Sequence, residues 1–281
     1  MAWRLTSDFE TYAARTAKLL TSSPAEHTVP LTVLEAVRGG RRWSDEPMLF
    51  GWLEDGGEVR GAVFRTPPFE LLLAVVPEDA TADLVAALRA AAAEVPGVNG
   101  DVAAADRFAV AWTAATGERA TTAMAMDLYE LGTLQLPEPA PVGRARVAGE
   151  ADLDLAVRWY TAFQQVTTSP VADVLPMVRE RMDDRRLWLW EDATGVPVSF
   201  AACTPAVAGV ARIAPVYTPP EHRRHGYASA VTAACTADAL ARGAQRVVLY
   251  TDVADPSANA MYRRLGFRPI GGRRVVKFGD V

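Results

Sequence analysis

The sequence has few cysteines and no long hydrophobic run. Only two of its 281 residues are cysteine, which excludes a small secreted scaffold held together by disulfides. Cys203 falls in an expected strand and Cys235 on an expected helix face, so both are predicted to be buried, reduced thiols. No apolar run approaches the roughly 20 residues that cross a bilayer, and charged residues interrupt the first twenty positions. These features predict a cytoplasmic protein without a secretion signal or membrane contact.

Clusters of positive charge are also lacking. The formal net charge is −5, with 29 lysines and arginines against 34 aspartates and glutamates. Nucleic-acid binding requires clustered cations, whereas these arginines are scattered along the chain. The charge therefore argues against a nucleic-acid partner and weakly favours a cationic substrate.

The length and a proline-rich segment indicate two domains. A chain of 281 residues, half of them hydrophobic, fits two domains of ordinary size. Three prolines in Leu136–Pro141 impose an extended path that interrupts both helix and sheet. The predicted organisation is a first domain over residues 1–136, a linker over 137–143 and a second domain over 144–281, which opens with a strand at Arg144–Val147.

The two halves resemble each other, which indicates a tandem repeat. Each contains a hairpin that ends in Thr-Pro, at Thr66-Pro67 in the first half and Thr204-Pro205 in the second. The first hairpin covers residues 49–67 and the second 187–205. Helices are expected before them at 8–22 and 31–38, and at 152–164 and 171–183. The helix expected at 8–22 is predicted to be amphipathic, and its start to be capped by Ser7 and Glu10.

A basic turn that carries a glycine, residues 219–229, is the most informative segment. It lies between an apolar strand and an alanine-rich helix expected over 228–242, which leads into a buried strand over 246–250. A helix start offers unpaired N–H groups and partial positive charge, and Gly226 lets the main chain approach a ligand closely. This turn is therefore a candidate site for a pyrophosphate.

A second candidate segment follows that strand. Asp255 is a predicted N-cap, Pro256 takes the first helical position, and Gly266 ends the short helix. Asn259 and Tyr262 are spaced by three residues, so they share one face of the helix. Taken alone, Tyr262 would be read as an ordinary half-buried tyrosine.

Together these segments resemble the GNAT superfamily of acyl-CoA-dependent N-acetyltransferases over about residues 210–270. Arg223-x-x-Gly226-x-Ala228 resembles the pyrophosphate loop of that family, with Arg in place of Gln and Ala in place of the last Gly. The segment from Asp255 to Phe267 resembles its second motif. The resemblance implies an α/β (α+β) fold of two tandem GNAT-like domains, each with a mixed, mostly antiparallel sheet flanked by helices.

The resemblance also implies roles for individual residues. Tyr262 is expected to protonate the departing thiolate as the catalytic residue, and a phenol hydrogen-bonded to the sulfur would favour departure of the thiol. The backbone of the strand end is expected to bind the acetyl carbonyl and pantetheine arm of acetyl-CoA, and the loop its pyrophosphate. The expected cofactor-binding residues are Val216, Tyr217, Thr218, Arg223, Arg224, His225, Gly226, Tyr227, Ala228, Ser229 and Asn259. No metal is expected, because the histidines of this loop lack further ligands in the sequence.

The first half lacks these features. Asp79 and Asp83 stand where the second half has arginines and Gly226, and carboxylates at a helix start repel a pyrophosphate. This half is expected to be a degenerate GNAT-like domain that binds no cofactor. Its segment Pro96–Gly100 is interpreted as a turn, followed by a helix with Phe108 and Trp112.

The acceptor and the general base stay open at this stage. The acceptor is expected to be a primary amine of a small molecule or peptide, in a site lined by the helices at 152–164 and 171–183. Trp159, Tyr160 and Phe163 are candidates for contact with it, although core packing is the simpler account for at least two of them. The nearby acids Asp252, Glu191 and Glu221 are all candidates for the base. The alternative function is a CoA-binding sensor or scaffold without transfer activity, and pairing of the halves within one chain fits a monomer.

Overall fold

The computed structural model describes residues 2–166 and 173–279, and its elements divide into two compact units. The first unit comprises residues 1–127 and 271–281, and the second comprises residues 128–270. Two long strands, β6 (Ala120–Leu131) and β12 (Phe267–Phe278), each begin in one unit and end in the other.

The first unit is a sheet with helices packed against it. Its strands follow the order β1-β2-β3-β4-β5-β12, in which β4 and β5 are parallel and the other neighbours antiparallel. Its elements are β1 (Ala2–Thr6), α1 (Phe9–Thr21), α2 (Thr28–Arg38), β2 (Leu49–Asp55), β3 (Glu58–Arg65), β4 (Leu71–Val75), the short 3-10 helix η1 (Glu78–Ala80), α3 (Thr81–Ala90), β5 (Gly97–Asp101) and α4 (Val102–Thr116).

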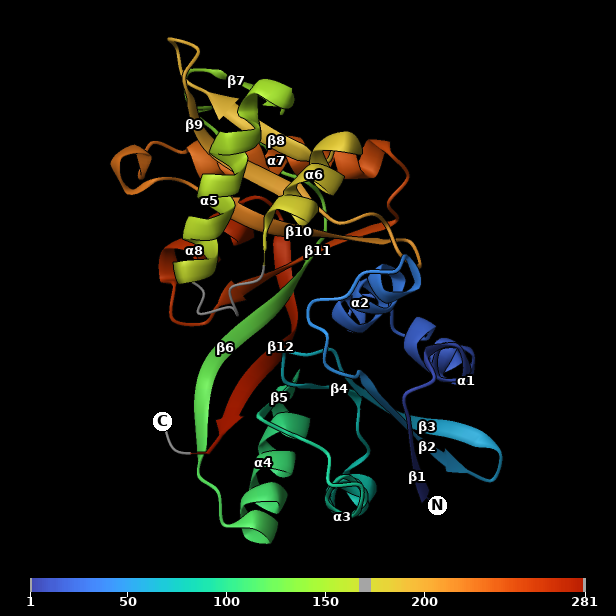
Figure 1. The fold of residues 1–281 in the computed structure, drawn as a ribbon. Helices are drawn as coiled ribbons and strands as arrows, with labels where there is room; N and C mark the ends of the chain where they lie inside the picture. Colours follow the sequence, from blue (N-terminus) through green and yellow to red (C-terminus); the bar gives the residue numbers. More distant parts are fainter. Residues whose placement is uncertain (1, 167–172, 280–281) are drawn as a thin grey trace. The chain divides into compact units, whose positions relative to one another are not determined.

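The second unit repeats this succession of elements (Figure 1). Its strands follow the order β6-β11-β10-β9-β8-β7, with β10 and β11 as the parallel pair. Its elements are β7 (Arg144–Val147), η2 (Glu150–Asp152), α5 (Leu153–Val166), α6 (Leu175–Asp183), β8 (Leu187–Glu191), β9 (Pro197–Cys203), β10 (Val210–Tyr217), η3 (Pro220–His222), α7 (Tyr227–Ala241), β11 (Arg246–Asp252) and α8 (Pro256–Arg264). Both predicted hairpins and the opening strand at Arg144–Val147 are confirmed. The predicted mixed, mostly antiparallel sheet flanked by helices is confirmed as well.

Each face of the second sheet buries its own apolar cluster. One cluster joins α7 and α8 to the sheet, with Val231, Val247, Leu249 and Tyr262 among its members. The other joins α5 and α6 to the opposite face, with Val178 and Phe200 among its members. Both cysteines are buried and free, as predicted.

Three details of the first unit differ from the sequence-based predictions. Residues 2–6, for which no element was predicted, form strand β1, in which the buried Trp3 pairs with Leu53 of β2. Helix α1 is capped by Asp8, whose carboxylate accepts from the Thr11 N–H at 3.2 Å, so the predicted cap at Ser7 is wrong.

The segment read as a turn, Pro96–Gly100, lies mostly within strand β5, which is Gly97–Asp101. Its glycines serve close packing: a Cβ at Gly97 would lie 2.3 Å from the Val276 carbonyl oxygen, and one at Gly100 would lie 2.8 Å from Leu73 Cβ. The prediction of a turn from these glycines was therefore wrong, whereas the helix with Phe108 and Trp112 is present as α4.

Candidate active site

Strands β10 and β11 separate at their carboxyl ends. Their parallel pairing runs from Val210 opposite Arg246 to Ile213 opposite Leu249. Beyond Ile213, β10 bulges against β9: two residues separate the paired positions Ile213 and Val216 on β10, whereas one separates Cys203 and Ala201 on β9. Pro215, inside the bulge, has no N–H to donate. The end of β10 thus leaves the β11 ladder and presents the backbone of Val216 and Tyr217 beside the gap.

The side chains of Ser199 and Arg223 hold the end of β10 by hydrogen bonds. The sequence analysis did not identify Ser199 and assigned Arg223 to cofactor binding only. The Ser199 hydroxyl donates to the Tyr217 carbonyl at 3.1 Å and lies 2.8 Å from the Thr218 hydroxyl, and Ser199 is fully buried. Arg223 Nε donates to the Thr218 carbonyl at 3.0 Å. Arg223 therefore fixes the strand end in addition to any charge it adds. The only sequence signal for Ser199 was a small polar residue inside an apolar strand.

The loop before α7 has the backbone shape of an anion site. Arg224 and Gly226 are left-handed, with φ of +66° and +81°, and Gly226 is the N-cap of α7 without a side-chain cap. The first N–H groups of a helix have no acceptor within it, so those of Tyr227, Ala228 and Ser229 are oriented toward the loop. A non-glycine residue in a left-handed conformation costs about 1 kcal/mol or more. Such strain is found where a ligand site fixes the backbone, and this loop is exposed to solvent.

The rings of His225 and Tyr227 stack at the start of α7. Their centroids lie 5.5 Å apart with an interplanar angle of 17°. His225 Nδ1 lies 3.3 Å from the His222 carbonyl oxygen. These contacts order the residues that were predicted to cradle a pyrophosphate.

Asn259 and Tyr262 share a face of α8, as the spacing predicted, and both are buried. The Asn259 amide Nδ2 donates to the carbonyls of Asp252 and Asp255, at 2.8 and 2.7 Å. Its Oδ1 is buried without a hydrogen-bond partner among the described residues. Asn259 therefore joins β11 to α8 and keeps one acceptor for a ligand.

Tyr262 is 8% exposed, and its ring lies edge-on to Phe267 at 6.1 Å. Burial, and to a smaller extent the charge of Asp255, raise the pKa of its hydroxyl well above the ordinary value. The hydroxyl thus stays protonated across the neutral range, as a proton donor must, although the higher pKa also makes it a weaker acid. Val216 and Tyr227 pack on the apolar cluster that contains Tyr262, so the strand end, the loop and α8 meet on this face.

Of the three acids considered as base, Glu191 is already engaged. Its carboxylate accepts from Arg146 Nε at 2.5 Å and Arg144 Nε at 2.9 Å. The hydrogen bonds from Arg146, and then from Arg144, hold the pKa of Glu191 below its ordinary value, which makes it a poor base. Asp252 and Glu221 are exposed, and Asp252 accepts from the Ala254 N–H at 2.8 Å.

The three aromatic candidates on α5 differ in burial. Tyr160 belongs to the core, where its hydroxyl contacts the sulfur of Met177 at 3.0 Å. Trp159 and Phe163 are half-buried. The Trp159 ring lies 6.4 Å from the ring of Tyr217, at the end of β10. Core packing thus accounts for Tyr160, whereas Trp159 lies beside the candidate site.

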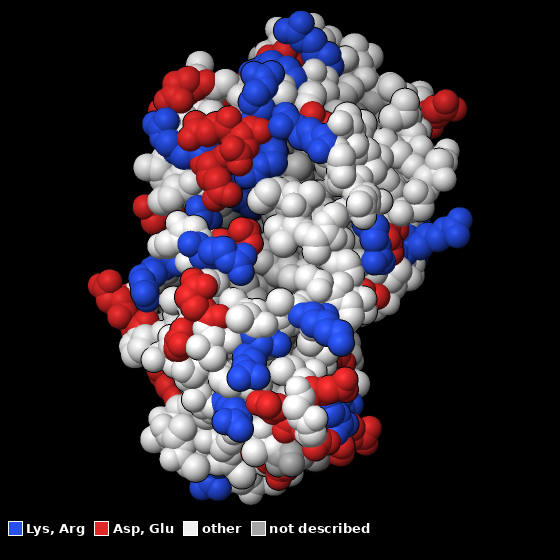
Figure 2. Space-filling model, turned by 90° about the vertical axis from the view of Figure 1, so that its right-hand side faces the viewer, with Lys and Arg blue, Asp and Glu red and all other residues white. Residues whose placement is uncertain are grey.

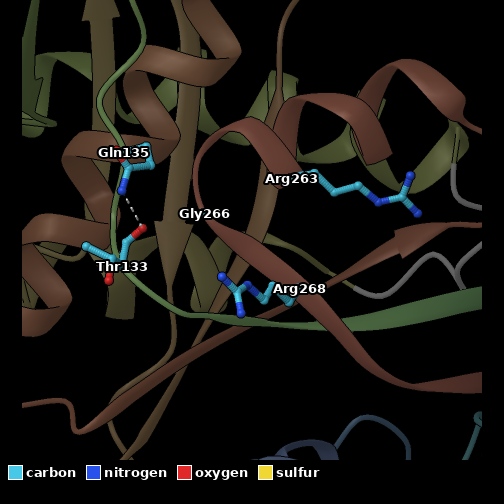
Figure 3. Close-up of a pocket in the computed structure, with 5 residues that line it drawn as sticks. All are labelled: Thr133, Gln135, Arg263, Gly266 and Arg268. Atoms are coloured by element: carbon cyan, nitrogen blue, oxygen red, sulfur yellow. Dashed lines mark hydrogen bonds between the residues drawn. The ribbon is translucent and has the colours of Figure 1, made fainter.

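A separate cavity of about 330 Å³ lies at the turn between α8 and β12 (Figure 3). Thr133, Gln135, Arg263, Gly266 and Arg268 line it, and the two arginine side chains point in different directions. None of the predicted site residues lines this cavity. Helix α8 begins after the carboxyl end of β11, and the cavity lies at the other, carboxyl-terminal end of this helix.

The described residues contain no group of three or more His, Cys, Asp and Glu side chains arranged to hold a metal ion. No helix in the described ranges has the length and apolar character needed to cross a membrane. On the face shown in Figure 2, positive and negative side chains lie next to one another instead of forming a continuous basic area.

Comparison with known proteins relates part of the chain to one protein family. Residues 154–267 match the model of the acetyltransferase (GNAT) family. No match is found among the curated proteins. Several solved structures resemble the chain along nearly its whole length, at less than 20% identity, so this likeness concerns the fold.

Three of these structures illustrate the likeness. An acetyltransferase of the GNAT family from Colwellia psychrerythraea has 13% identity and a TM-score of 0.60, with 99% of each chain covered. A GCN5-related N-acetyltransferase from Sphaerobacter thermophilus has 18% identity and a TM-score of 0.62, covering 98% of this chain and 95% of that one. A tandem GNAT protein from the clavulanic acid biosynthesis pathway has 15% identity and a TM-score of 0.56, covering 99% of this chain and 98% of that one.

The fold is therefore that of two tandem GNAT-like domains. Residues 154–267, which match the family model, form a GNAT-family acetyltransferase domain within this fold.

Proposed function

We propose that the protein transfers an acetyl group from acetyl-CoA to a primary amine of a small molecule or peptide, by direct attack within a ternary complex. The observation that supports this most is the left-handed loop at the start of α7, next to the open ends of β10 and β11. A pyrophosphate fits the N–H groups of the loop, and an extended pantetheine arm fits the gap between the strands.

Tyr262 and the backbone of Val216 would act on the thioester. As the amine nitrogen forms its bond to the carbonyl carbon, negative charge develops on the carbonyl oxygen, where the Val216 N–H would stabilise it. The C–S bond then breaks, and Tyr262 would donate its proton to the thiolate. The proton that the attacking nitrogen loses would pass to water, from which Tyr262 recovers one. Asn259 Oδ1, which has no hydrogen-bond partner among the described residues, would accept a hydrogen bond from an amide of the pantetheine arm.

In this proposal the first domain binds no acetyl-CoA. At the equivalent helix start, Glu78 and Asp79 lie in η1, and no left-handed residue occurs there. The indole of Trp3 donates to the Ala80 carbonyl at 3.0 Å and packs against this segment. We retain the domain limits 1–136 and 144–281, the cytoplasmic setting and the monomer as predictions.

The second candidate function is a CoA-binding sensor or scaffold. A protein that only binds CoA has no need of the buried, protonated Tyr262. We therefore favour the enzyme.

Amine-dependent release of CoA from acetyl-CoA tests the choice between the two functions. The enzyme predicts release that requires an amine from a panel of small primary amines and lysine peptides. Binding of acetyl-CoA without release by any amine would support the scaffold instead.

A further inference from the structure

The two faces of the second sheet offer different groups to the gap between β10 and β11. Val247 and Leu249 of β11 belong to the cluster under α7 and α8. Side chains alternate along a strand, so Tyr250 lies on the opposite face. Tyr217 packs on the cluster under α5 and α6. Tyr217 and Tyr250 therefore share the α5/α6 face, where Figure 1 shows those two helices in front of the strands.

Tyr250 lies where the strands separate. The last pair of the ladder is Ile213 with Leu249, and Tyr250 is the next residue on β11. Its hydroxyl is buried but has no hydrogen-bond partner among the described residues. A buried, unpaired hydroxyl is costly, by about 1–3 kcal/mol. A ligand that pairs with it would remove that cost.

Two acids of the second unit, Glu130 and Glu191, are poorly suited to take a proton from an amine. Arg246 donates to the Glu130 carboxylate, at 2.7 Å from Nη2, and these hydrogen bonds lower the pKa of Glu130. Glu191 is held in the same way by Arg146 and Arg144. A neutral tyrosine can accept one hydrogen bond and donate another, which lets it pass a proton without becoming charged.

We propose that the acceptor amine reaches the gap from the α5/α6 face and that the Tyr250 hydroxyl is a catalytic residue there. It accepts a hydrogen bond from the attacking N–H and donates one to water. When the N–C bond has formed and the C–S bond breaks, the nitrogen gives its proton to Tyr250, and the proton of Tyr250 passes to water. Tyr262, on the other face, supplies the proton of the thiol. This proposal rests on the proposed acetyltransferase function.

The test is Tyr250→Phe, which keeps the ring and removes only the hydroxyl. Tyr129→Phe is a matched control, because the Tyr129 hydroxyl is also buried without a partner but its ring belongs to the cluster on the opposite face. Transfer is measured with two probes of the same shape, 2-phenylethylamine and its much less basic β,β-difluoro analogue, beside amines that the release assay identifies. The affinity for acetyl-CoA is measured in parallel.

We expect Tyr250→Phe to lower kcat at least about 10-fold with the basic amine and clearly less with the weakly basic one. The affinity for acetyl-CoA should not change, and Tyr129→Phe should transfer at the original rate. An equal kcat for Tyr250→Phe and the unmodified chain, or an equal loss with both amines, would overturn the role of Tyr250 while the transferase function stands. If the unmodified chain transfers to no amine, both proposals fail.

Discussion

Replacing Gly226 by alanine changes both the binding of acetyl-CoA and the stability of the fold, and a matched control variant tells the two effects apart. Gly226 has φ of +81°, and a Cβ there would meet only the Pro141 ring at 3.7 Å, an ordinary contact. The cost to folding is therefore the left-handed conformation alone, about 1–2 kcal/mol. Gly243, just after the other end of α7, has φ of +93° with nothing within 4 Å of its Cβ position. Gly243→Ala is thus a control with matched backbone strain.

The two variants should lose similar stability but differ in binding. In Gly226→Ala we expect the added methyl group to hinder the approach of a pyrophosphate to the loop. The loss of about one charge-assisted hydrogen bond would cost roughly 1.5–3 kcal/mol of binding free energy. Since about 1.4 kcal/mol corresponds to tenfold in Kd, acetyl-CoA should bind about 10- to 100-fold more weakly. Chemical denaturation measures the loss of stability, and calorimetric titration measures the Kd for acetyl-CoA. An unchanged Kd in Gly226→Ala, or an equal rise in Gly243→Ala, would refute the assignment of the loop.

Three further predictions concern the residues around the gap. Tyr262→Phe should lower kcat by about 100-fold or more, the usual range for a general acid, with an unchanged Kd for acetyl-CoA; an unchanged kcat would mean that water protonates the thiolate. Ser199→Ala removes a hydrogen bond of about 1 kcal/mol to the end of β10, so the binding of acetyl-CoA should weaken several-fold. An unaltered Kd would show that the strand end keeps its conformation without this hydrogen bond. Because Arg146 and Arg144 lower the pKa of Glu191, its pairing stabilises the fold above the unfolded pKa of about 4.3 and that contribution is lost as pH falls through the lower folded value. Glu191→Gln should therefore flatten the acid limb of a stability-versus-pH curve, and an identical limb would contradict the pairing.

The sequence predicted the elements whose signals are local. Asp255 does cap α8, with its carboxylate accepting from the Ala258 N–H at 2.9 Å, and Gly266 follows the helix with φ of +96°. These roles depend on residues within one or two turns of helix, so the order of residue types is sufficient to reveal them.

Features that depend on distant residues were missed. The glycines of β5 resemble a turn until Val276 and Leu73 are seen beside them. Strand β1 is decided by the burial of Trp3 against β2 and Ala80, which no pattern within six residues shows. The hydroxyls of Ser199 and Tyr250 acquire their significance only where β9, β10 and β11 meet.

Calorimetric titration of the full chain with acetyl-CoA, beside a Gly226→Glu variant, tests the central claim most directly. The account predicts one site per chain, abolished in the variant because a carboxylate would stand in the loop that holds the pyrophosphate. Absence of binding to the unmodified chain, or binding that survives in the variant, would contradict it.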